Sequence, residues 1–291
     1  MDAERHPGAY GFRIVASDSG VVLPGLVDVP ADAAVAHVSW DVGPIPDDFV
    51  EIDDERVDLS VPDIVAIGVE RASGRVTIRL PDAPTPEAIV HPMLTTPLAF
   101  LARWRGHACL HAGAILHEGE AVVVCGSQGA GKSTTLATLA ARGMPVVTED
   151  LVVLDGWHVL SGPHCVDLRG DAAERFPDAR YLGTIGRRER FRLLTPPAPF
   201  RVPLRGVFLL DWSADGAAPT AQPLGLGERL ALIHAYDYAG VLGIPRPATL
   251  LELAEVPMWR LSRPRDLSTA DRALDLLLET AATAKPARPA A

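Results

Sequence analysis

A glycine-rich turn between an apolar run and a helix-forming run constrains the fold of this sequence more than any other feature. The turn runs from Gly126 to Gly131, Lys132 and Ser133, which fits the phosphate-loop pattern G-x-x-x-x-G-K-S in full. Glycines let such a loop curl so that successive backbone N–H groups point inward at phosphate oxygens. A helix over residues 134–141 would add the partial positive charge of its N-terminus. The residues expected to bind a nucleotide are Gly126, Ser127, Gln128, Gly129, Ala130, Gly131, Lys132, Ser133 and Thr134.

Two side chains of this loop have specific tasks at a bound nucleotide. Lys132 would reach the β- and γ-phosphates, and the Ser133 hydroxyl would bind Mg²⁺. Only two of the 27 basic residues are lysines, Lys132 and Lys285, and all the others are arginines. Lysine is thus retained where a compact charge on a flexible stem must meet phosphate. A nucleotide together with Mg²⁺ is the expected ligand.

Composition narrows the class of protein further. The 291 residues carry a net charge of −10, which argues against nucleic-acid and membrane-surface partners because both require basic patches. The sequence has no apolar run of transmembrane length, and its polar N-terminus lacks the apolar core of a signal peptide. Three widely spaced cysteines suit the reduced thiols of a cytosolic protein. We therefore expect a cytoplasmic location.

The first eighty residues are rich in β-type runs. Residues 63–70 and 75–80 form the pattern of a hairpin, with a short glycine-containing turn between them. Three prolines within residues 81–86 mark the best candidate boundary. This β-rich part could bind substrate, mediate assembly or cover the core. The expected units are a smaller β-rich N-terminal domain over residues 1–90, a phosphate-loop domain over 91–284 and a disordered tail over 285–291.

The segment before the loop predicts a mixed sheet. Residues 97–105 have the pattern of a helix, and residues 108–116 that of one buried strand carrying His111. A turn at residues 117–120 would pair that strand with the loop strand as a hairpin, which is not the parallel order of a simple Rossmann unit. From the residues alone, His111 could be a hydrogen-bonded core histidine or a site residue.

The segment after the loop supplies acidic side chains. The loop helix is expected to stop at Arg142-Gly143, and the following apolar strand ends in Glu149 and Asp150. Carboxylates at such a strand end can lie close to Mg²⁺ and the γ-phosphate. The alternative is a charged turn between two strands.

The remaining chain continues the α/β pattern. A short helix over residues 171–176 carries Asp171 and Glu174 near its start. The arginines of a turn at 186–190 could clamp phosphate or an acidic substrate, or could be plain surface. Strands are expected over 159–167, 207–211 and 258–261, and helices over 227–238 and 266–283.

Several of these residues together resemble a known family. Leu110-His111, the phosphate loop, Arg142-Gly143 and the pair Glu149-Asp150 resemble the C-terminal catalytic domain of HPr kinase/phosphorylases. The resemblance implies an α/β fold of the α+β type with a mixed sheet, whose core is similar to that of ATP-dependent phosphoenolpyruvate carboxykinases. Within the family, the chain looks most like shorter kinases encoded beside ribosomally made peptides, including lasso-peptide precursor kinases, which also open with a β-rich segment.

The resemblance also implies roles for individual residues. Asp150 matches the carboxylate that takes the proton from the acceptor serine, and His111 matches a histidine near the transferring phosphate. Glu149 stands where the family has its first aspartate. A second magnesium carboxylate would be Asp171 or Glu174, of which Glu174 completes the expected metal set with Ser133 and Asp150. The arginine on the substrate side would be Arg187 or Arg188, with Arg188 preferred.

These inferences lead to one function and two alternatives. The resemblance implies a Mg-ATP-dependent serine kinase that modifies a small peptide, such as a lasso-type precursor, with Asp150, His111, Lys132, Glu149 and Arg188 as catalytic residues. Family members are often oligomeric, so a homo-oligomer is possible. The alternatives are a kinase of a small hydroxylated metabolite and a catalytically silent nucleotide-binding sensor. The intact Lys132, Ser133 and Asp150 count against the sensor.

Overall fold

The computed structural model describes residues 5–18, 20–214, 216–238, 249–266 and 269–284. Within these residues the chain folds as a mixed α/β protein with sheets of eight, nine and three strands. The expected tail at 285–291 lies outside the described residues. None of the described helices combines the length and the apolar character that crossing a lipid bilayer requires.

The N-terminal part is an eight-stranded sheet with the strand order β3-β1-β2-β4-β8-β7-β6-β5. The expected hairpin is present, because β7 and β8 pair antiparallel from Glu70 opposite Arg75 to Ala66 opposite Arg79. The sheet is not purely antiparallel, since β4 lies parallel to both β2 and β8. Its strands are β1 (Arg5–Ala9), β2 (Phe12–Ala16), β3 (Val27–Pro30), β4 (Ala34–Val42), β5 (Phe49–Ile52), β6 (Arg56–Val61), β7 (Val65–Glu70) and β8 (Arg75–Leu80).

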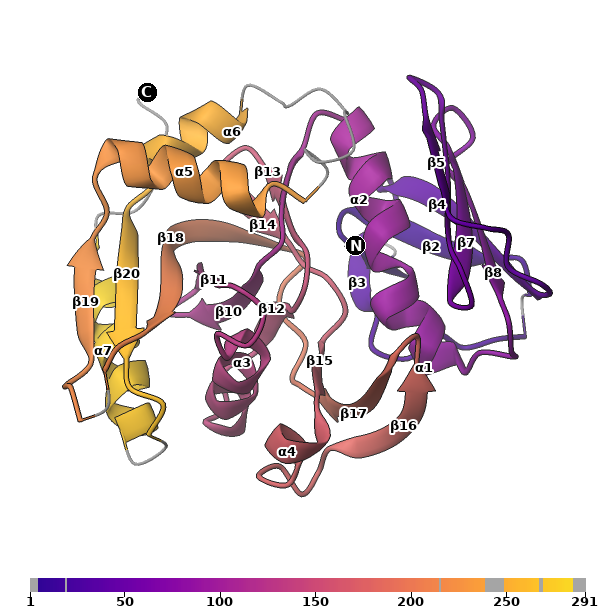
Figure 1. Cartoon of the computed structure of the whole chain (residues 1–291). Coiled ribbons are helices and arrows are strands. Elements are labelled where there is room, and N and C mark those ends of the chain that lie inside the picture. Colours follow the sequence, from indigo (N-terminus) through magenta and orange to yellow (C-terminus); the bar gives the residue numbers. More distant parts are fainter. Residues whose placement is uncertain (1–4, 19, 215, 239–248, 267–268, 285–291) are drawn as a thin grey trace.

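One hydrophobic core crosses the proline-rich segment at 81–86. Helix α2 (Thr95–Trp104) lies between the N-terminal sheet and the rest of the molecule (Figure 1). Ile78 of the sheet, Leu98 of the helix and Val153 of the central sheet belong to the same buried cluster. The short helix α1 (Pro86–Ala88) and a wide turn η1 (Ile89–Met93) lead from the sheet into α2. The two parts of the chain are therefore packed as neighbours around shared apolar side chains.

The nine-stranded central sheet is mixed, as expected. Strand β11 pairs antiparallel with β10 and parallel with β18, and β18 in turn lies parallel to β20. Alternation along β11 directs Val123 toward the cluster of α5 and Val122 toward the cluster of α3 and α7. Its strands are β9 (Ala108–Leu110), β10 (Gly113–His117), β11 (Glu120–Cys125), β12 (Val146–Thr148), β13 (Val152–Asp155), β14 (His158–Leu160), β18 (Arg201–Trp212), β19 (Thr220–Pro223) and β20 (Met258–Arg263).

The single strand expected over residues 108–116 is wrong. The structure has two strands there, β9 and β10, because β9 pairs with β13 whereas β10 pairs with β11 and β12. The backbone changes partners at His111, whose N–H donates to the carbonyl of Tyr236. Gly113 allows the close approach, since a Cβ there would lie 2.6 Å from the carbonyl oxygen of Glu149. The break leaves His111 between two strands.

A three-stranded sheet of order β15-β17-β16 lies beside the loop helix. The expected basic turn at 186–190 is shorter than predicted, because Arg188, Glu189 and Arg190 already belong to β17 and pair with β16. These strands are β15 (Cys165–Leu168), β16 (Arg180–Ile185) and β17 (Arg188–Leu194). The remaining helices are α3 (Lys132–Ala141), α4 (Gly170–Ala173), α5 (Leu226–Tyr236), α6 (Thr249–Glu252), η3 (Leu253–Glu255) and α7 (Ala270–Thr283).

Candidate active site

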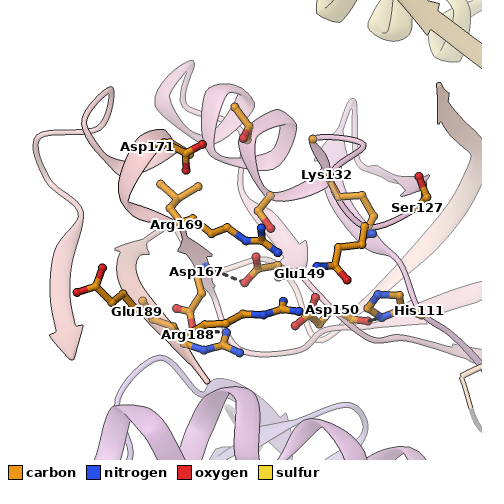
Figure 2. A pocket seen from close by; sticks show the side chains of 18 residues that line it. His111, Ser127, Lys132, Glu149, Asp150, Asp167, Arg169, Asp171, Arg188 and Glu189 are labelled. Carbon is orange, nitrogen blue, oxygen red and sulfur yellow. Dashed lines mark hydrogen bonds and ion pairs between the residues drawn. The ribbon is translucent and has the colours of Figure 1, made fainter. Parts of the chain in front are cut away.

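A pocket of about 480 Å³ opens between the phosphate loop and the three-stranded sheet. Figure 2 shows Lys132, Ser127 and His111 on one side of it and Asp171, Arg169 and Glu189 on the other. The acidic pair after β12 lies between the two sides. The polar and charged residues that line it are His111, Ser127, Gln128, Lys132, Ser133, Thr134, Glu149, Asp150, Asp167, Arg169, Asp171, Arg188, Glu189 and Arg190.

The loop has the curled backbone that its glycines predict. Gly129 and Gly131 have φ values of 82° and 85°, in the left-handed region that favours glycine. Gly126 is packed beneath the loop, where a Cβ would lie 2.8 Å from that of Ala130. Gly126 and Ala130 therefore shape the loop from below, whereas the other expected residues face the pocket.

Lys132 is folded onto its own loop. Its Nζ donates to the carbonyl oxygen of Gly126 at 2.6 Å. Burial lowers the pKa of Lys132, and the negative charge of Asp150 offsets this only in part. An anion in the pocket would add the charge partner that this ammonium lacks in the loop itself.

Three carboxylates lie around one buried histidine close to the phosphate loop. His91 is 1% exposed, and its Nε2 lies 3.2 Å from Glu149 Oε2, 3.5 Å from Asp150 Oδ2 and 3.9 Å from Asp167 Oδ2. Its Nδ1 is 3.2 Å from the hydroxyl of Thr95. Burial by itself lowers the pKa of His91, but the carboxylates outweigh burial and raise it above the ordinary value. We call Glu149, Asp150 and Asp167 with His91 the carboxylate cluster.

The three carboxylates differ in their access to the pocket. The Asp150 side chain is 32% exposed, whereas those of Glu149 and Asp167 are 5% and 2% exposed. Glu149 Oε2 accepts the backbone N–H of Asp167 at 2.7 Å (Figure 2). Burial raises the pKa of the Glu149 carboxyl, and the facing imidazole offsets this only in part. Asp150 is therefore the member of the cluster whose carboxylate a bound molecule can reach most easily.

Asp167 is held by two arginines of β17. Arg192 donates from Nε to Oδ1 at 2.7 Å and from Nη2 to Oδ2 at 2.9 Å, a two-pronged pair. Arg190 donates to Oδ2 at 3.1 Å. Burial alone would raise the pKa of Asp167, but His91 and the guanidiniums outweigh it and lower the pKa. Arg192 also donates to the backbone carbonyls of Glu87 and His91, which fixes the cluster to the segment before α2.

His111 reaches the pocket from the break between β9 and β10. Its ring lines the pocket with one part open to solvent, so it is not a core histidine. Nδ1 lies 3.1 Å from the carbonyl oxygen of Asp150, which orients the ring. Enclosure by the pocket walls lowers the pKa of His111, outweighing the nearby Asp150 carboxylate. A neutral ring beside the loop is thus favoured.

The positions of Asp171 and Glu174 beside the pocket differ from what the sequence predicted for a metal ligand. Asp171 at the start of α4 lines the pocket, whereas Glu174 is exposed and does not line it, so the expected metal role of Glu174 does not fit its position. Of the two arginines weighed for the substrate side, Arg188 lines the pocket and Arg187 does not.

Sequence reasoning missed His91, Asp167 and Arg192. One signal for Asp167 was present, because a carboxylate inside the buried run Cys165–Leu168 needs a charged partner. The partners lie far along the chain, so no local pattern identifies them. His91 precedes a proline in the segment between the two parts of the molecule and carries no motif at all.

The N-terminal sheet supplies the floor of this region. Tyr10, in the turn between β1 and β2, is 1% exposed and has a positive φ of 55°. Its backbone N–H donates to the carbonyl of Ser161 at 2.7 Å, and its hydroxyl lies near the side chains of Thr148 and Thr95. Burial raises the pKa of Tyr10. Since Thr95 contacts His91, this turn buttresses the carboxylate cluster from below.

Mg²⁺ fits the donors that surround the pocket. Among the described residues, no group of three or more histidine, cysteine, aspartate or glutamate side chains could hold a metal ion by itself. Mg²⁺ in phosphate sites usually takes only one or two protein carboxylates and completes its shell with phosphate oxygens and water. The Ser133 hydroxyl and the exposed Asp150 carboxylate are oxygen donors of this kind in one pocket.

Comparisons with known proteins give a weak partial match among solved structures. No family model matches the chain, and no curated protein matches it. Among solved structures, part of the chain is similar to the Hpr(Ser) kinase/phosphatase from Coxiella burnetii, at 12% identity and a TM-score of 0.30. The match covers 59% of this chain and 95% of that one. Similarity at this level does not identify a reaction, so function has to be judged from the site itself.

Proposed function

We propose that this protein is a Mg-ATP-dependent phosphotransferase that moves the γ-phosphate to an alcohol group of a small peptide. One observation carries the proposal: the phosphate loop with Lys132 and the partly exposed carboxylate of Asp150 line the same pocket. A site that only binds a nucleotide needs the loop, whereas a kinase also needs a group that accepts the proton of the incoming hydroxyl.

The proposed reaction uses Asp150 as the proton acceptor. The acceptor oxygen forms a bond to the γ-phosphorus as the bond to the bridging oxygen breaks, and ADP leaves. The hydroxyl proton passes to Asp150. Glu149 and Asp167 are buried and tied to each other, so they position Asp150 and His91 rather than react.

Charge neutralisation falls to the loop. Lys132 would leave the Gly126 carbonyl and bind the β- and γ-phosphates, and the backbone N–H groups of the loop would hold their oxygens. Ser133 and one oxygen of Asp150 would hold Mg²⁺, which when bound would neutralise charge on the phosphates, and the other oxygen of Asp150 would take the hydroxyl proton. His111 would lie near the transferring group as a neutral hydrogen-bonding side chain.

A serine peptide is the first choice of acceptor because of the sequence resemblance to precursor-peptide kinases. A small hydroxylated acid is the second candidate, favoured by the arginines Arg169 and Arg188 that line the wall opposite the loop. Both acceptors carry an alcohol group, so the same Asp150 chemistry applies.

The decisive experiment is mass spectrometry of serine-containing peptides and hydroxylated acids after incubation with protein, ATP and Mg²⁺. We expect the mass of one phosphoryl group to appear on a peptide serine. Lys132→Ala should abolish the product, whereas Lys285→Ala, which removes the only other lysine, should not. Transfer to hydroxylated acids alone would show that the protein is a kinase of a small metabolite. ATP binding without transfer to any hydroxyl would favour the catalytically silent sensor. Full activity in Lys132→Ala would refute the assignment of residues 126–133 as the phosphate-binding loop.

A further inference from the structure

A second cavity, of about 280 Å³, adjoins the active-site pocket on the outer side of the phosphate loop. The two cavities share Gly129, Gly131, Thr134, Asp171 and Ala172, so they meet between the start of helix α3 and helix α4. Lys132, Ser133 and the three carboxylates of the cluster line the first cavity and not the second. The second cavity is therefore a side chamber reached along the loop.

The order of the loop residues fixes which end of a nucleotide would reach this chamber. The lysine of such a loop binds the β- and γ-phosphates and the loop N–H groups hold the α- and β-phosphates. The γ-phosphate would point toward Asp150, in the first cavity. The α-phosphate then lies at the opposite end of the row, toward Thr134, which lines both cavities. Whatever is attached to the α-phosphate must extend into the side chamber or into solvent.

The chamber has a wall suited to a flat aromatic group. The guanidinium carbon of Arg263 lies 4.5 Å from the ring centroid of Trp212, and that of Arg265 lies 5.4 Å away. Trp212 donates from Nε1 to the carbonyl of Gly129 at 3.2 Å, and Arg263 donates from Nη2 to the carbonyl of Ala130 at 2.7 Å. The wall is thus fastened directly to the phosphate loop.

Arg263 also carries an unused donor. The residue is 7% exposed, and its Nη1 has no hydrogen-bond partner among the described residues. Burial lowers the pKa of Arg263 to about 10, which shows how poorly this charge is solvated. A buried donor left without a partner is costly, and a ligand with acceptor atoms in the chamber would relieve that cost.

We propose that this side chamber binds the nucleoside half of the phosphate donor, with its base stacked on the Trp212–Arg263–Arg265 wall. Leu274 of α7 and Ala172 of α4 supply apolar surface opposite, and the unused Nη1 of Arg263 supplies a donor to the base or ribose. This inference rests on the proposed function, because it requires a nucleotide on the loop. It assigns base binding to β18, β20 and α7, which lie far from the loop in the sequence.

The test compares ATP with inorganic tripolyphosphate, which has the phosphates but no base, by calorimetry with Mg²⁺. The wild type should bind ATP at least about 10-fold more tightly, given the size of base-stacking contributions. Trp212→Ala should lose about 10-fold in ATP affinity and keep its tripolyphosphate affinity. Ala270→Phe fills the chamber without touching the loop and should act in the same way, whereas Ala282→Phe on the exposed face of the same helix should change neither affinity.

Other outcomes separate the two ideas. Equal weakening of both ligands by Trp212→Ala, with no effect of Ala270→Phe, would mean that Trp212 only supports the loop and would overturn the base site. Equal wild-type affinity for ATP and tripolyphosphate would also overturn it. Failure of the wild type to bind either ligand would overturn the proposed function, and the base site with it.

Discussion

The phosphate loop and the carboxylates of the cluster line one pocket, yet they are built in opposite ways. The loop is a contiguous run whose lysine bonds to a carbonyl only six residues away. The cluster takes His91, the adjacent pair Glu149-Asp150 and Asp167 from three separate segments, and Arg192 bonds to Asp167 and to the His91 carbonyl. The comparison teaches that the curl of the loop is encoded locally in the chain, whereas the carboxylate cluster depends on long-range packing of buried charges.

The largest expected effect tests whether the two regions have different roles. One side chain is changed in each region, and ATP binding and phosphoryl transfer are measured separately. Asp150→Asn should reduce transfer by about 10²–10⁴-fold, the usual contribution of a general base, while ATP binding persists. Lys132→Ala should weaken ATP binding as well. Nucleotide titration and single-turnover assays distinguish the two variants. Unchanged turnover in Asp150→Asn would remove Asp150 as the base.

The next test concerns stability. Asp167→Asn leaves Arg192 buried without its ionic partner, which should lower the free energy of unfolding by about 3–5 kcal/mol. Denaturant unfolding measures this loss. Asp41→Asn removes one partner of the exposed Asp41–Arg79 pair and should cause no detectable change. Similar losses of unfolding free energy in both variants would show that burial does not make the Asp167–Arg192 pair more important for stability than an exposed pair.

A smaller effect should appear in the pH dependence of stability without metal. His91 faces Glu149, Asp150 and Asp167, with Arg192 bonded to its carbonyl, and its pKa is raised. Its stabilisation is complete below the unfolded pKa of about 6.5 and is lost as the pH rises through the folded value. The melting temperature of His91→Gln should therefore lie below that of the wild type at pH 6. The difference between the two melting temperatures should be smaller at pH 9. A difference that widens with pH would contradict the assignment.

The smallest expected effect lies on the loop side. Arg142, at the end of α3, pairs with Asp271 and Asp275 of α7 at 2.6 and 2.7 Å. Both acidic partners are largely exposed, so Arg142→Ala should cost about 0.2–1 kcal/mol of stability. ATP affinity should stay unchanged because the contact is at the far end of the helix. A large loss of affinity would show that the loop depends on α7 for its shape.

The same contrast explains what the sequence could predict of the fold. The loop, its helix and the β7–β8 hairpin follow from local signals, namely glycine positions, apolar runs and turn residues. The break at His111 does not, because the apolar run is continuous and the change of strand partner is decided by β13 and β11. Arg188 was expected in a turn but extends β17, since pairing with β16 is a long-range choice.

For the site, the sequence predicted the residues that carry a motif and missed those that support them. Asp150 followed from its place at a strand end. The sequence did not predict that Asp150 is much more exposed than Glu149, because the burial of Glu149 depends on how Asp167 and His91 pack around it. The placement of Asp171 rather than Glu174 at the pocket depends on the direction of a single helical turn.

Arg192 carries a consequence for the order of folding. Its guanidinium bonds to carbonyls 105 and 101 residues earlier in the chain, as well as to Asp167. Contacts of such sequence separation close only after large loops have been ordered, so they form late. The phosphate loop also receives distant contacts, because Trp212 and Arg263 donate to the carbonyls of Gly129 and Ala130. During refolding, the loop and the carboxylate cluster should therefore both be completed late, and phosphoryl transfer should return only with the fully packed chain.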